Sequence, residues 1–593
     1  MQQDTSSPSR EAPSMRRATE TLPGLNAPVD LWRDAWGVPH LRAQGSDDAF
    51  FALGYVHATD RLWQMDALRR RATGRYAEWM GPAALPMDRL VRRMGIADCS
   101  RQDAAAANDE TRAMLASYTA GVNAFIATGA LSVEYQRLGA TPEPWEDWHC
   151  MAVLRQTGLL LNSVYPKLWR AIALPVIGAD GISRLRMDDG GDELVCIPPG
   201  ATAGRTMPDT AELADALAAF VHESEIEPAG GGSNNWALHG SRTASGLPLV
   251  AGDPHRVLDM PNMYLQCHVA CDAFDVIGLT TPGVPGFPHF AHNENVAWCV
   301  TVAFVDTADV YLERFESDAT RYLRRPSEEP IQPETASDGG GGGAGMNDED
   351  IRTPAPSAAQ LHEEWADVRR RVERIGVRGQ ADDECEVLVT ARGPVVAGDA
   401  RSGHALVLRH SSDVEVDRSF DTLLPMMRAP SVDSLFEATR GWGLVDHNLV
   451  AGDVHGHIGH HVRAKVPRRP AANGWLPVPG WLEHHDWNGF VPWEAMPRQI
   501  DPEAGVIVTA NNRVVAPSQE YLSTDCHPPH RARRIWQQIH GMTKASVADM
   551  EAVHRDTLSI PARELCERLS QLSLDDPASA ALRDRLVAWD ARL

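Results

Sequence analysis

The spacing of apolar residues divides the chain into a helical first part and a strand-rich second part. From Asp47 to about Met80, apolar and bulky side chains recur every three or four residues, which is the spacing of an amphipathic helix. Similar spacing continues through most of the sequence up to about position 180. The stretch 29–43 comes before it and predicts a short hairpin that turns at Trp36 and Gly37. The first part is therefore expected to be largely α.

After position 232 the pattern changes to alternation. Runs rich in β-branched residues predict strands, first at NNWALHG, LPLVAG, AFDVIGLT and VAWCVTVAF, and later at ECEVLVT and HALVLRH. Helical spacing returns from about Ala532. The last residues, LVAWDARL, are expected to lie inside a helix, so we expect the C-terminus to be truncated.

Composition sets the boundaries between the parts. Residues 1–26 are polar and are expected to form a disordered tail, and 27–185 form the helical part. Residues 186–232 are acidic and rich in Pro and Gly, which is typical of a linker. The strand-rich part covers 233–593 and contains a low-complexity stretch, 335–350, that is expected to be a disordered loop.

Composition and charge exclude several classes of protein. The chain has 593 residues, 43% of them hydrophobic, which is enough for a large unit or several domains. A formal net charge of -24 argues against nucleic acid as a partner. No apolar run approaches the roughly 18 residues of a membrane span, and the N-terminus lacks the apolar core of a secretory signal. Together with nine scattered cysteines, this predicts a cytoplasmic protein, or a periplasmic one if the true start lies upstream.

The serine that follows the glycine run carries the strongest chemical signal. In GGGSNNW, the hydroxyl of Ser233 could attack the carbonyl of Gly232, because glycine tolerates the strained backbone that this attack needs. Hydrolysis of the resulting ester would make Ser233 a new N-terminus. Its α-amine, with a pKa of about 7.7–8.0, could then act as the base for its own hydroxyl. The same few residues also fit a glycine-rich loop before a strand that begins with serine.

The longer stretch SNNWALHGSRTASGLPLVAGDPHR resembles the start of the mature β-chain in the penicillin acylase family. This family of N-terminal-nucleophile hydrolases includes cephalosporin acylases and acyl-homoserine-lactone acylases. DLWRDAWGVPHLRA and ALGYVHATDRLWQMDALRRRATGRYAE resemble the opening of its α-chain, so the likeness runs from about residue 29 to the end. Family members are typically longer. The resemblance implies an α+β fold, the four-layer αββα sandwich, and maturation into an α/β heterodimer by cutting at the spacer.

The resemblance also implies the nucleophile and its neighbour. Ser233 would be the nucleophile, exposed by cleavage after Gly232. His255 stands where the family has His or Gln beside the nucleophile, and a neutral imidazole there could hydrogen-bond Ser233 and orient the amine or a water molecule. A histidine at the end of a strand, satisfied by the backbone, is the alternative for this position.

Two donors for the oxyanion are implied in the same way. They are the side-chain amide of Asn511, in TANNR, and the backbone N–H of Val302. Arg533 or Arg534 matches a family arginine that helps to hold this asparagine, and Arg534 is preferred because it directly precedes an isoleucine. The alternatives are an asparagine turn at 511 and a solvated helix face that carries the arginines.

Several family members bind a structural Ca²⁺, although the chemistry itself requires no cofactor. The resemblance implies Asp306 and Asp309 as oxygen ligands, and carboxylates at that spacing suit a hard cation. The family also uses a glutamate of the α-chain. Lys167 lies near the position expected for that glutamate, and a lysine would oppose the metal.

Four histidines in VHGHIGHHV raise a second metal hypothesis. Imidazoles at this spacing could bind zinc. The resemblance instead implies a D-x-x-G-x-I-G hairpin, in which alternating side chains point to opposite faces. We favour the hairpin over a zinc site formed by His455, His457, His460 and His461.

Arg256 and Phe290 are the residues implied to line the acyl pocket. Phe290 favours an apolar or aromatic acyl group, whereas Arg256 favours a polar or acidic one, or points elsewhere. They do not decide between β-lactam side chains and fatty acyl chains. The predicted function is an autoprocessed serine amidohydrolase that cleaves small N-acyl amides of the penicillin or cephalosporin type through an acyl-enzyme on Ser233. The alternatives are a quorum-quenching acyl-homoserine-lactone acylase and an unprocessed, inactive or metal-binding relative.

Overall fold

The computed structural model describes residues 18–20, 24–158, 164–185, 231–256, 258–325, 363–514 and 521–593. The expected loop 335–350, nearly all of the expected linker and most of the expected tail lie outside these residues. Within the expected tail, β1 (Ala18–Glu20) pairs with the strand that follows. None of the helices in the described ranges is long and apolar enough to cross a bilayer.

The first part of the chain is a hairpin followed by helices, as its spacing predicts. Strands β2 (Val29–Arg33) and β3 (Pro39–Arg42) form the hairpin around the expected turn. Gly54 and Gly121 let two of the helices touch. A Cβ on Gly54 would lie 2.1 Å from a backbone oxygen of the opposite helix, and a Cβ on Gly121 would lie 1.9 Å from one. The helices are α1 (Ser46–Ala72), α2 (Ala77–Met80), α3 (Leu85–Met94), α4 (Ile96–Ala106), α5 (Asp109–Ile126), α6 (Val133–Leu138), α7 (Asp147–Gly158) and α8 (Val164–Leu185).

A ten-stranded sheet continues from this first part into the second. Its order is β1-β2-β3-β6-β7-β8-β9-β17-β18-β20. Strand β3 pairs with β6 in parallel, so the sheet contains strands from both sides of the predicted cut. The strands of the second part are β6 (Leu265–Cys271), β7 (Phe274–Thr280), β8 (Phe290–His292), β9 (Val296–Val302), β17 (His447–Asp453), β18 (Ile458–Arg463) and β20 (Arg498–Ile500).

A smaller sheet packs on the larger one. Its order is β21-β4-β5, and its strands are β4 (Gly232–Leu238), β5 (Leu249–His255) and β21 (Val506–Thr509). Successive side chains of β4 point to opposite faces of the small sheet. Ala237 packs with Cys299 and Val450 between the sheets, and Trp236 packs with Ile535 and Met550 on the outer face. The outer helices are α12 (His530–Ile539) and α13 (Val547–His554).

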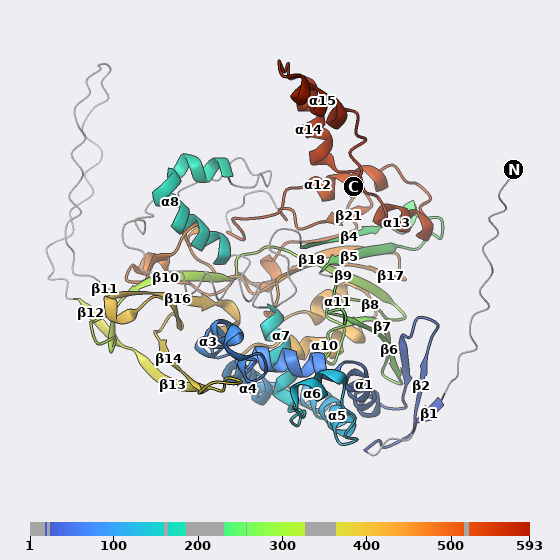
Figure 1. Ribbon diagram of the computed structural model, residues 1–593. Coiled ribbons are helices and arrows are strands. Elements are labelled where there is room, and N and C mark those ends of the chain that lie inside the picture. Colours follow the sequence, from blue (N-terminus) through green and yellow to red (C-terminus); the bar gives the residue numbers. More distant parts are fainter. Residues whose placement is uncertain are drawn as a thin grey trace, which may run out of the picture.

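The layers follow the predicted order. From bottom to top, Figure 1 shows helices such as α1 and α5, the large sheet, the small sheet, and then α12 and α13. The main core fills the space between the lower helices and the large sheet, and it includes α10 (Ser419–Met427) and α11 (Val432–Ala438). The predicted α+β fold with a four-layer αββα sandwich is therefore confirmed.

The remaining elements lie beside and above this sandwich (Figure 1). The predicted strands ECEVLVT and HALVLRH are confirmed as β14 (Asp383–Val389) and β16 (His404–His410). The expected C-terminal helix ends earlier than predicted, at Val587, and the last residues turn back so that Leu593 N donates to Thr557 O at 3.0 Å. These elements are β10 (Ala308–Arg314), β11 (Arg321–Arg325), β12 (Glu364–Asp367), β13 (Arg369–Ile375), β14 (Asp383–Val389), β15 (Val395–Ala397), β16 (His404–His410), β19 (Val478–Pro479), α14 (Ile560–Ser570) and α15 (Pro577–Val587).

Candidate functional site

Ser233 is the second residue of β4, and it lies buried at the end of the small sheet. Strand β5 flanks β4 on one side, with Ser233 opposite Pro254, and β21 flanks it on the other. Asn511 follows the end of β21 by two residues, so the pairing brings it back to Ser233. Its backbone is left-handed, with φ of 65°, a conformation that asparagine adopts more readily than most residues.

Asn511 contacts both reactive atoms of Ser233. Its Oδ1 accepts a hydrogen bond from Ser233 N at 2.7 Å, and its Nδ2 donates to Ser233 Oγ at 3.3 Å and to the Val302 carbonyl at 2.9 Å. Arg531 Nη2 donates to the same Oδ1 at 2.9 Å. Because a guanidinium can only donate, this contact orients the amide so that its N–H group faces the serine hydroxyl. Asn511 therefore contacts Ser233 directly, and its amide also bonds the Val302 carbonyl, which brings all three residues close together.

Arg531, rather than the predicted Arg534, is the arginine at this site. Its Nη1 also donates to Ser233 O at 2.8 Å and to Asn234 Oδ1 at 2.7 Å. Arg534 instead pairs with Asp556 at 2.6 Å. Arg531 is the second residue of α12, whereas Arg534 lies about 4.5 Å farther along the helix axis, away from Asn511. The prediction that Arg534 holds Asn511 is wrong for this reason.

Gly232 is needed for space rather than for an unusual backbone conformation. Its φ is not in the left-handed range. A Cβ at this position would lie 2.8 Å from Arg531 Nη2 and 3.1 Å from Asn511 Oδ1. Any side chain on residue 232 would therefore push against the groups that hold Ser233. Glycine is required here because Arg531 and Asn511 approach closely, and not because the backbone is strained.

His255 lies opposite Gly232 on β5, beside the predicted cleavage site. Its Nε2 is 3.0 Å from Asn234 Nδ2 and 3.3 Å from Asp253 Oδ2. Burial alone would raise the pKa of Asp253, but the hydrogen bond from His255 holds it below its ordinary value. Within the described ranges no hydrogen bond joins His255 to Ser233, so the structure places this histidine near Ser233 without the expected contact.

A buried polar network below Ser233 was not found from the sequence. Asn235 Nδ2 donates to the backbone carbonyls of Cys299 and Asn448, at 3.1 and 3.3 Å, and its Oδ1 accepts from the Thr509 hydroxyl. Thr509 is also 2.9 Å from Thr301. These contacts tie β4 and β21 to β9 and β17. The one available signal was the second asparagine of SNNW, which falls on the inner face of its strand.

A second buried group, which we call the arginine–histidine cluster, consists of Arg256, Tyr264, His289, His447 and Arg463. Arg463 Nη2 is 3.0 Å from His447 Nδ1 and also donates to the Pro288 carbonyl. The His289 ring lies 5.3 Å from that of His447 and 5.4 Å from that of Tyr264. Arg256 Nη2 is 3.4 Å from the Tyr264 hydroxyl. The five side chains therefore form one continuous group.

The arginine–histidine cluster lacks a counter-charge. Across the described segments, no ion pair joins Arg256 or Arg463 to a carboxylate, and buried nitrogens of Arg256, His289 and Arg463 have no hydrogen-bond partner. Burial lowers the pKa of Arg463 to about 9 and that of His289 to about 3. The histidines are consequently neutral at pH 7, and the two arginines carry the charge of the cluster.

The predicted acyl-pocket residues lie at this cluster. Arg256 belongs to it, and Phe290 directly follows His289 and approaches β5 closely enough to meet a Cβ built on Gly252 at 3.0 Å. His447 is opposite Val302 across β9 and β17. Because Asn511 Nδ2 donates to the Val302 carbonyl and to Ser233 Oγ, the cluster is linked to Ser233 through Val302 and Asn511.

Asp306 and Asp309 bind cations of the protein itself. Lys167 Nζ donates to one oxygen of each carboxylate at 3.0 Å. Arg469 contacts the other oxygens, at 2.9 Å for Asp306 and 3.1 Å for Asp309. Among the residues that the structure describes, no group of three or more His, Cys, Asp or Glu side chains could hold a metal ion. The residues present do not fit the implied calcium ion, because an ammonium lies between the two carboxylates.

The four histidines of the predicted hairpin do not converge. The hairpin itself is present as β17 and β18. His457 pairs with Asp501 at 2.6 Å, His460 is 2.9 Å from Asn448 Oδ1, and the His461 ring lies 4.9 Å from that of Trp493. The hairpin is the correct interpretation, and the structure gives no support for a zinc site here.

Comparison with known proteins decides the family. The family model described as penicillin amidase matches residues 28–341 and 346–593. The chain belongs to the penicillin amidase family. The penicillin acylase 2 proenzyme of Pseudomonas sp. (strain SE83) is 52% identical over 97% of this chain and 70% of its own length. The acyl-homoserine lactone acylase QuiP of Pseudomonas aeruginosa is 28% identical over 97% of this chain and 67% of its own.

A solved structure is also similar. The thermostable penicillin G acylase from Alcaligenes faecalis is 23% identical, with a TM-score of 0.48, over 60% of this chain and 59% of its own. The family match confirms the resemblance that the motifs indicated. It also confirms the predicted class of activity, the hydrolysis of amide bonds. The lower identity to QuiP gives less support to the acyl-homoserine-lactone alternative.

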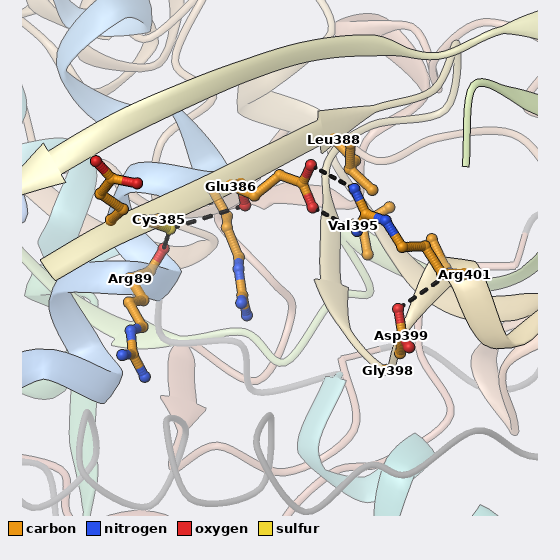
Figure 2. Close-up of a pocket in the computed structure, with 11 residues that line it drawn as sticks. Arg89, Cys385, Glu386, Leu388, Val395, Gly398, Asp399 and Arg401 are labelled. Carbon is orange, nitrogen blue, oxygen red and sulfur yellow. Dashed lines mark hydrogen bonds and ion pairs between the residues drawn. The ribbon is translucent and has the colours of Figure 1, made fainter. Parts of the chain in front are cut away.

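This member of the penicillin amidase family also has a cavity of about 190 Å³ away from Ser233, between α3, β14 and β15. Figure 2 shows that Arg401 on its wall donates to both oxygens of Glu386 and that its backbone contacts Asp399. None of the predicted site residues lines it. Because the charge of Arg401 is paired and no member of the Ser233 site is present, we do not include this cavity in the candidate site.

Proposed function

We propose that the chain cleaves itself between Gly232 and Ser233, and that the freed Ser233 then hydrolyses small N-acyl amides. The observation that carries this proposal is the position of Asn511, whose amide contacts both the nitrogen and the hydroxyl of Ser233. The proenzyme designation of the relative that is 52% identical supports processing into two chains.

Self-cleavage proceeds by an N-to-O shift. Ser233 Oγ attacks the Gly232 carbonyl carbon, the C–N bond breaks, and the serine nitrogen takes up the hydroxyl proton. Water then hydrolyses the ester and leaves a carboxylate on Gly232. Arg531 and Asn511 hold Ser233 during this step, and the absence of a side chain on residue 232 lets them stay close.

The processed enzyme uses the new α-amine as its base. With an ordinary pKa of about 7.7–8.0, the amine is partly neutral near pH 7.5 and accepts the hydroxyl proton as Oγ attacks the substrate carbonyl. Asn511 Nδ2 and the Val302 backbone N–H stabilise the oxyanion, and each such donor contributes about 2.7–4 kcal/mol. The leaving amine takes the proton, and water then releases the acyl group from Ser233.

The arginine–histidine cluster is suited to binding an acyl group that ends in a carboxylate. Two arginines without counter-charge, together with neutral histidine and tyrosine donors, can pair with an anion, and a guanidinium matches a carboxylate in geometry. Phe290, the first residue of β8, packs against the main core and against the apolar residues between the two sheets. A short methylene chain next to Phe290 would join the scissile carbonyl to the anionic end.

N-terminal sequencing tests the self-cleavage. One band of the wild-type protein on a denaturing gel should begin Ser-Asn-Asn-Trp. Ser233→Ala should leave a single uncut chain, whereas Ser245→Ala, a nearby exposed serine, should be cut normally. Cleavage of Ser233→Ala at the same bond would show that an outside protease makes the cut.

A pair of nitroanilides tests the acyl group. Glutaryl and pentanoyl 4-nitroanilide have the same chain length, but only the first ends in a carboxylate. We expect a kcat/KM for the glutaryl compound that is about 30-fold higher or more, the factor that corresponds to ~2 kcal/mol. Equal rates would contradict the anionic acyl group, and faster hydrolysis of a long-chain acyl-homoserine lactone would favour the quorum-quenching alternative.

A further inference from the structure

Lys167, Asp306, Asp309 and Arg469 form a buried group that we call the Lys167 cluster. Lys167 comes from α8, and its side chain is completely buried. Its ammonium donates to Asp306 Oδ1, to Asp309 Oδ1 and to the backbone carbonyl of Ala308. An ammonium has three donors, and all three are used here.

The Lys167 cluster is complete in charge and in hydrogen bonds. Two cations face two carboxylates, and each of the four carboxylate oxygens accepts at least one hydrogen bond or ion pair. Burial would raise the pKa of Asp309, but Arg469 and Lys167 hold it below its ordinary value. The carboxylate oxygens receive further donors from Asn473, Trp487 and Tyr521, at 3.0, 2.6 and 2.9 Å. No carboxylate oxygen is left for a metal ion.

The Lys167 cluster lies at the end of the segment that begins with Val302. Strand β9 ends at Val302, and β10 begins at Ala308. Asp306 lies between them, and its backbone N–H donates to Leu522 O at 2.7 Å. The ion pairs of Asp306 and Asp309 therefore fix the path of the backbone that leaves the oxyanion-hole residue.

One turn farther along α8, Arg170 reaches the other half of the oxyanion hole. It donates to both oxygens of Asp525 at 2.9 Å. Two residues later, His527 N donates to the Asn511 carbonyl at 2.9 Å. Helix α8 therefore supports the segments of both Val302 and Asn511. Figure 1 shows α8 next to β10, against which it packs.

Cleavage before Ser233 would place this helix in a different chain from its partners. Lys167 and Arg170 would belong to the α-chain, and Asp306, Asp309 and Asp525 to the β-chain. We propose that Lys167 is a fixed cation that takes the place of a divalent metal, joins the two chains, and positions the segment from Val302 to Ala308. This inference rests on the proposed function, and it gives the α-chain a positioning role at the oxyanion hole.

A calcium titration of the processed wild-type enzyme tests the first half of the proposal. The two-chain protein is treated with EGTA and dialysed, and Tm and kcat are then measured as Ca²⁺ is added to millimolar concentration. A ligand that binds only the folded state must raise Tm. We expect no change in Tm or in kcat. A saturating rise in Tm would show that calcium binds and would overturn the proposal.

Charge-balance variants test the second half. Lys167→Met strands a carboxylate, and Lys167→Met/Asp306→Asn restores the balance of charge. Lys465→Met is the matched control, because it removes another lysine that forms an ion pair, with Glu415. We expect Lys167→Met to lower kcat about tenfold or more with little change in KM, since an oxyanion donor acts mainly in the transition state. The double variant should recover most of this loss, and the control should match the wild type.

The remaining outcomes also support or overturn the proposal. A Lys167→Met enzyme with lower Tm but unchanged kcat would reduce Lys167 to a purely structural residue and overturn the positioning role. If the single variant does not fold, a folded double variant supports the charge balance, and failure of both variants contradicts it. N-terminal sequencing of the wild type reports the cut at Ser233 separately, so failure of the proposed function is distinguishable from failure of this inference.

Discussion

The Lys167 cluster and the arginine–histidine cluster both carry charges inside the protein, but only the first pairs its cations with carboxylates. In the Lys167 cluster, two cations meet two carboxylates. In the arginine–histidine cluster, two arginines meet no carboxylate within the described part of the chain. A buried charge without a partner is costly, so it is retained where it serves a purpose beyond packing. The complete cluster is suited to holding segments together, and the incomplete one to binding an anion.

Arg469 and Arg463 show the contrast in their pKa values. Burial acts to lower the pKa of both guanidinium groups. Asp309 and Asp306 outweigh this effect for Arg469, whose pKa is raised above its ordinary value. No group offsets it for Arg463, whose pKa falls to about 9. An anion bound beside Arg463 would act on it as Asp309 acts on Arg469.

The largest effect is expected from removing a charge of the complete cluster. In a Ser233→Ala background, which keeps one chain, Arg469→Met should cost about 3–5 kcal/mol of folding stability because it strands a buried carboxylate. Arg463→Met strands no charge and should cost less, about 1–3 kcal/mol, because it leaves the buried Pro288 carbonyl without its donor. Thermal or denaturant unfolding would measure both. Equal losses would contradict the distinction between the clusters.

Asp446 is a carboxyl residue that belongs to neither cluster. It is half-buried, its carboxylate accepts from Val305 N at 3.1 Å, and desolvation of the carboxyl raises its pKa to about 7 despite its backbone hydrogen bonds. Because the folded pKa lies above the unfolded value, its stabilising contribution is full below about pH 4 and is lost as the pH rises to about 7.

Asp446→Asn should therefore gain stability over the wild type as the pH rises through this window. The difference should grow by up to about 1.4 kcal/mol per pH unit and become constant above about pH 7. Unfolding of both proteins at several pH values would measure it. A difference that does not depend on pH would mean that the carboxyl has an ordinary pKa.

Substitution of Arg463 tests, through its effect on activity, whether the arginine–histidine cluster binds an anion. Arg463→Met should lower kcat/KM for glutaryl 4-nitroanilide by about 30-fold, the factor for ~2 kcal/mol. The pentanoyl compound should be affected little, because it has no anionic end. Arg534→Met, which removes an arginine paired with Asp556 away from Ser233, is the control. A similar loss with both substrates would assign Arg463 to general packing.

The smallest effect is expected at the surface. His457 is exposed, and its pair with Asp501 raises the pKa of the imidazole. Because this folded pKa lies above about 6.5, the stabilisation is present below that pH and disappears as the pH rises through the folded value. His457→Ala should cost only about 0.2–1 kcal/mol at pH 5 and less at pH 8. A larger loss, measured by unfolding at both values, would mean that this exposed pair behaves like a buried one.

Resemblance to the penicillin acylase family, carried by local motifs, implied the layered fold and the meeting of Ser233 with Asn511. SNNW and TANNR are short motifs that each match the family locally, so the resemblance could indicate Ser233 and Asn511 without knowledge of how distant segments pack. Arg531 could not, because three arginines occur within four residues, and the start of α12 decides which of them faces Asn511. The lysine at 167 was recognised as opposing a metal, but Arg469, the second cation that pairs with Asp306 and Asp309, lies far along the chain.

The arginine–histidine cluster was beyond sequence reasoning for a related reason. Arg256 was the one member that the motifs indicated. His289, His447 and Arg463 come from or next to β8, β17 and β18, and they approach one another only when the large sheet forms. Neutral histidines and an unpaired arginine are also properties of burial, which a sequence does not display.

The parallel pairing of β3 with β6 has a consequence for biosynthesis. The proposed cleavage before Ser233 would leave these strands hydrogen-bonded to each other in separate molecules. If the two pieces were made from separate messages, each would present an open strand edge, and such edges invite aggregation. Assembly therefore favours one translated precursor, folded first and divided afterwards.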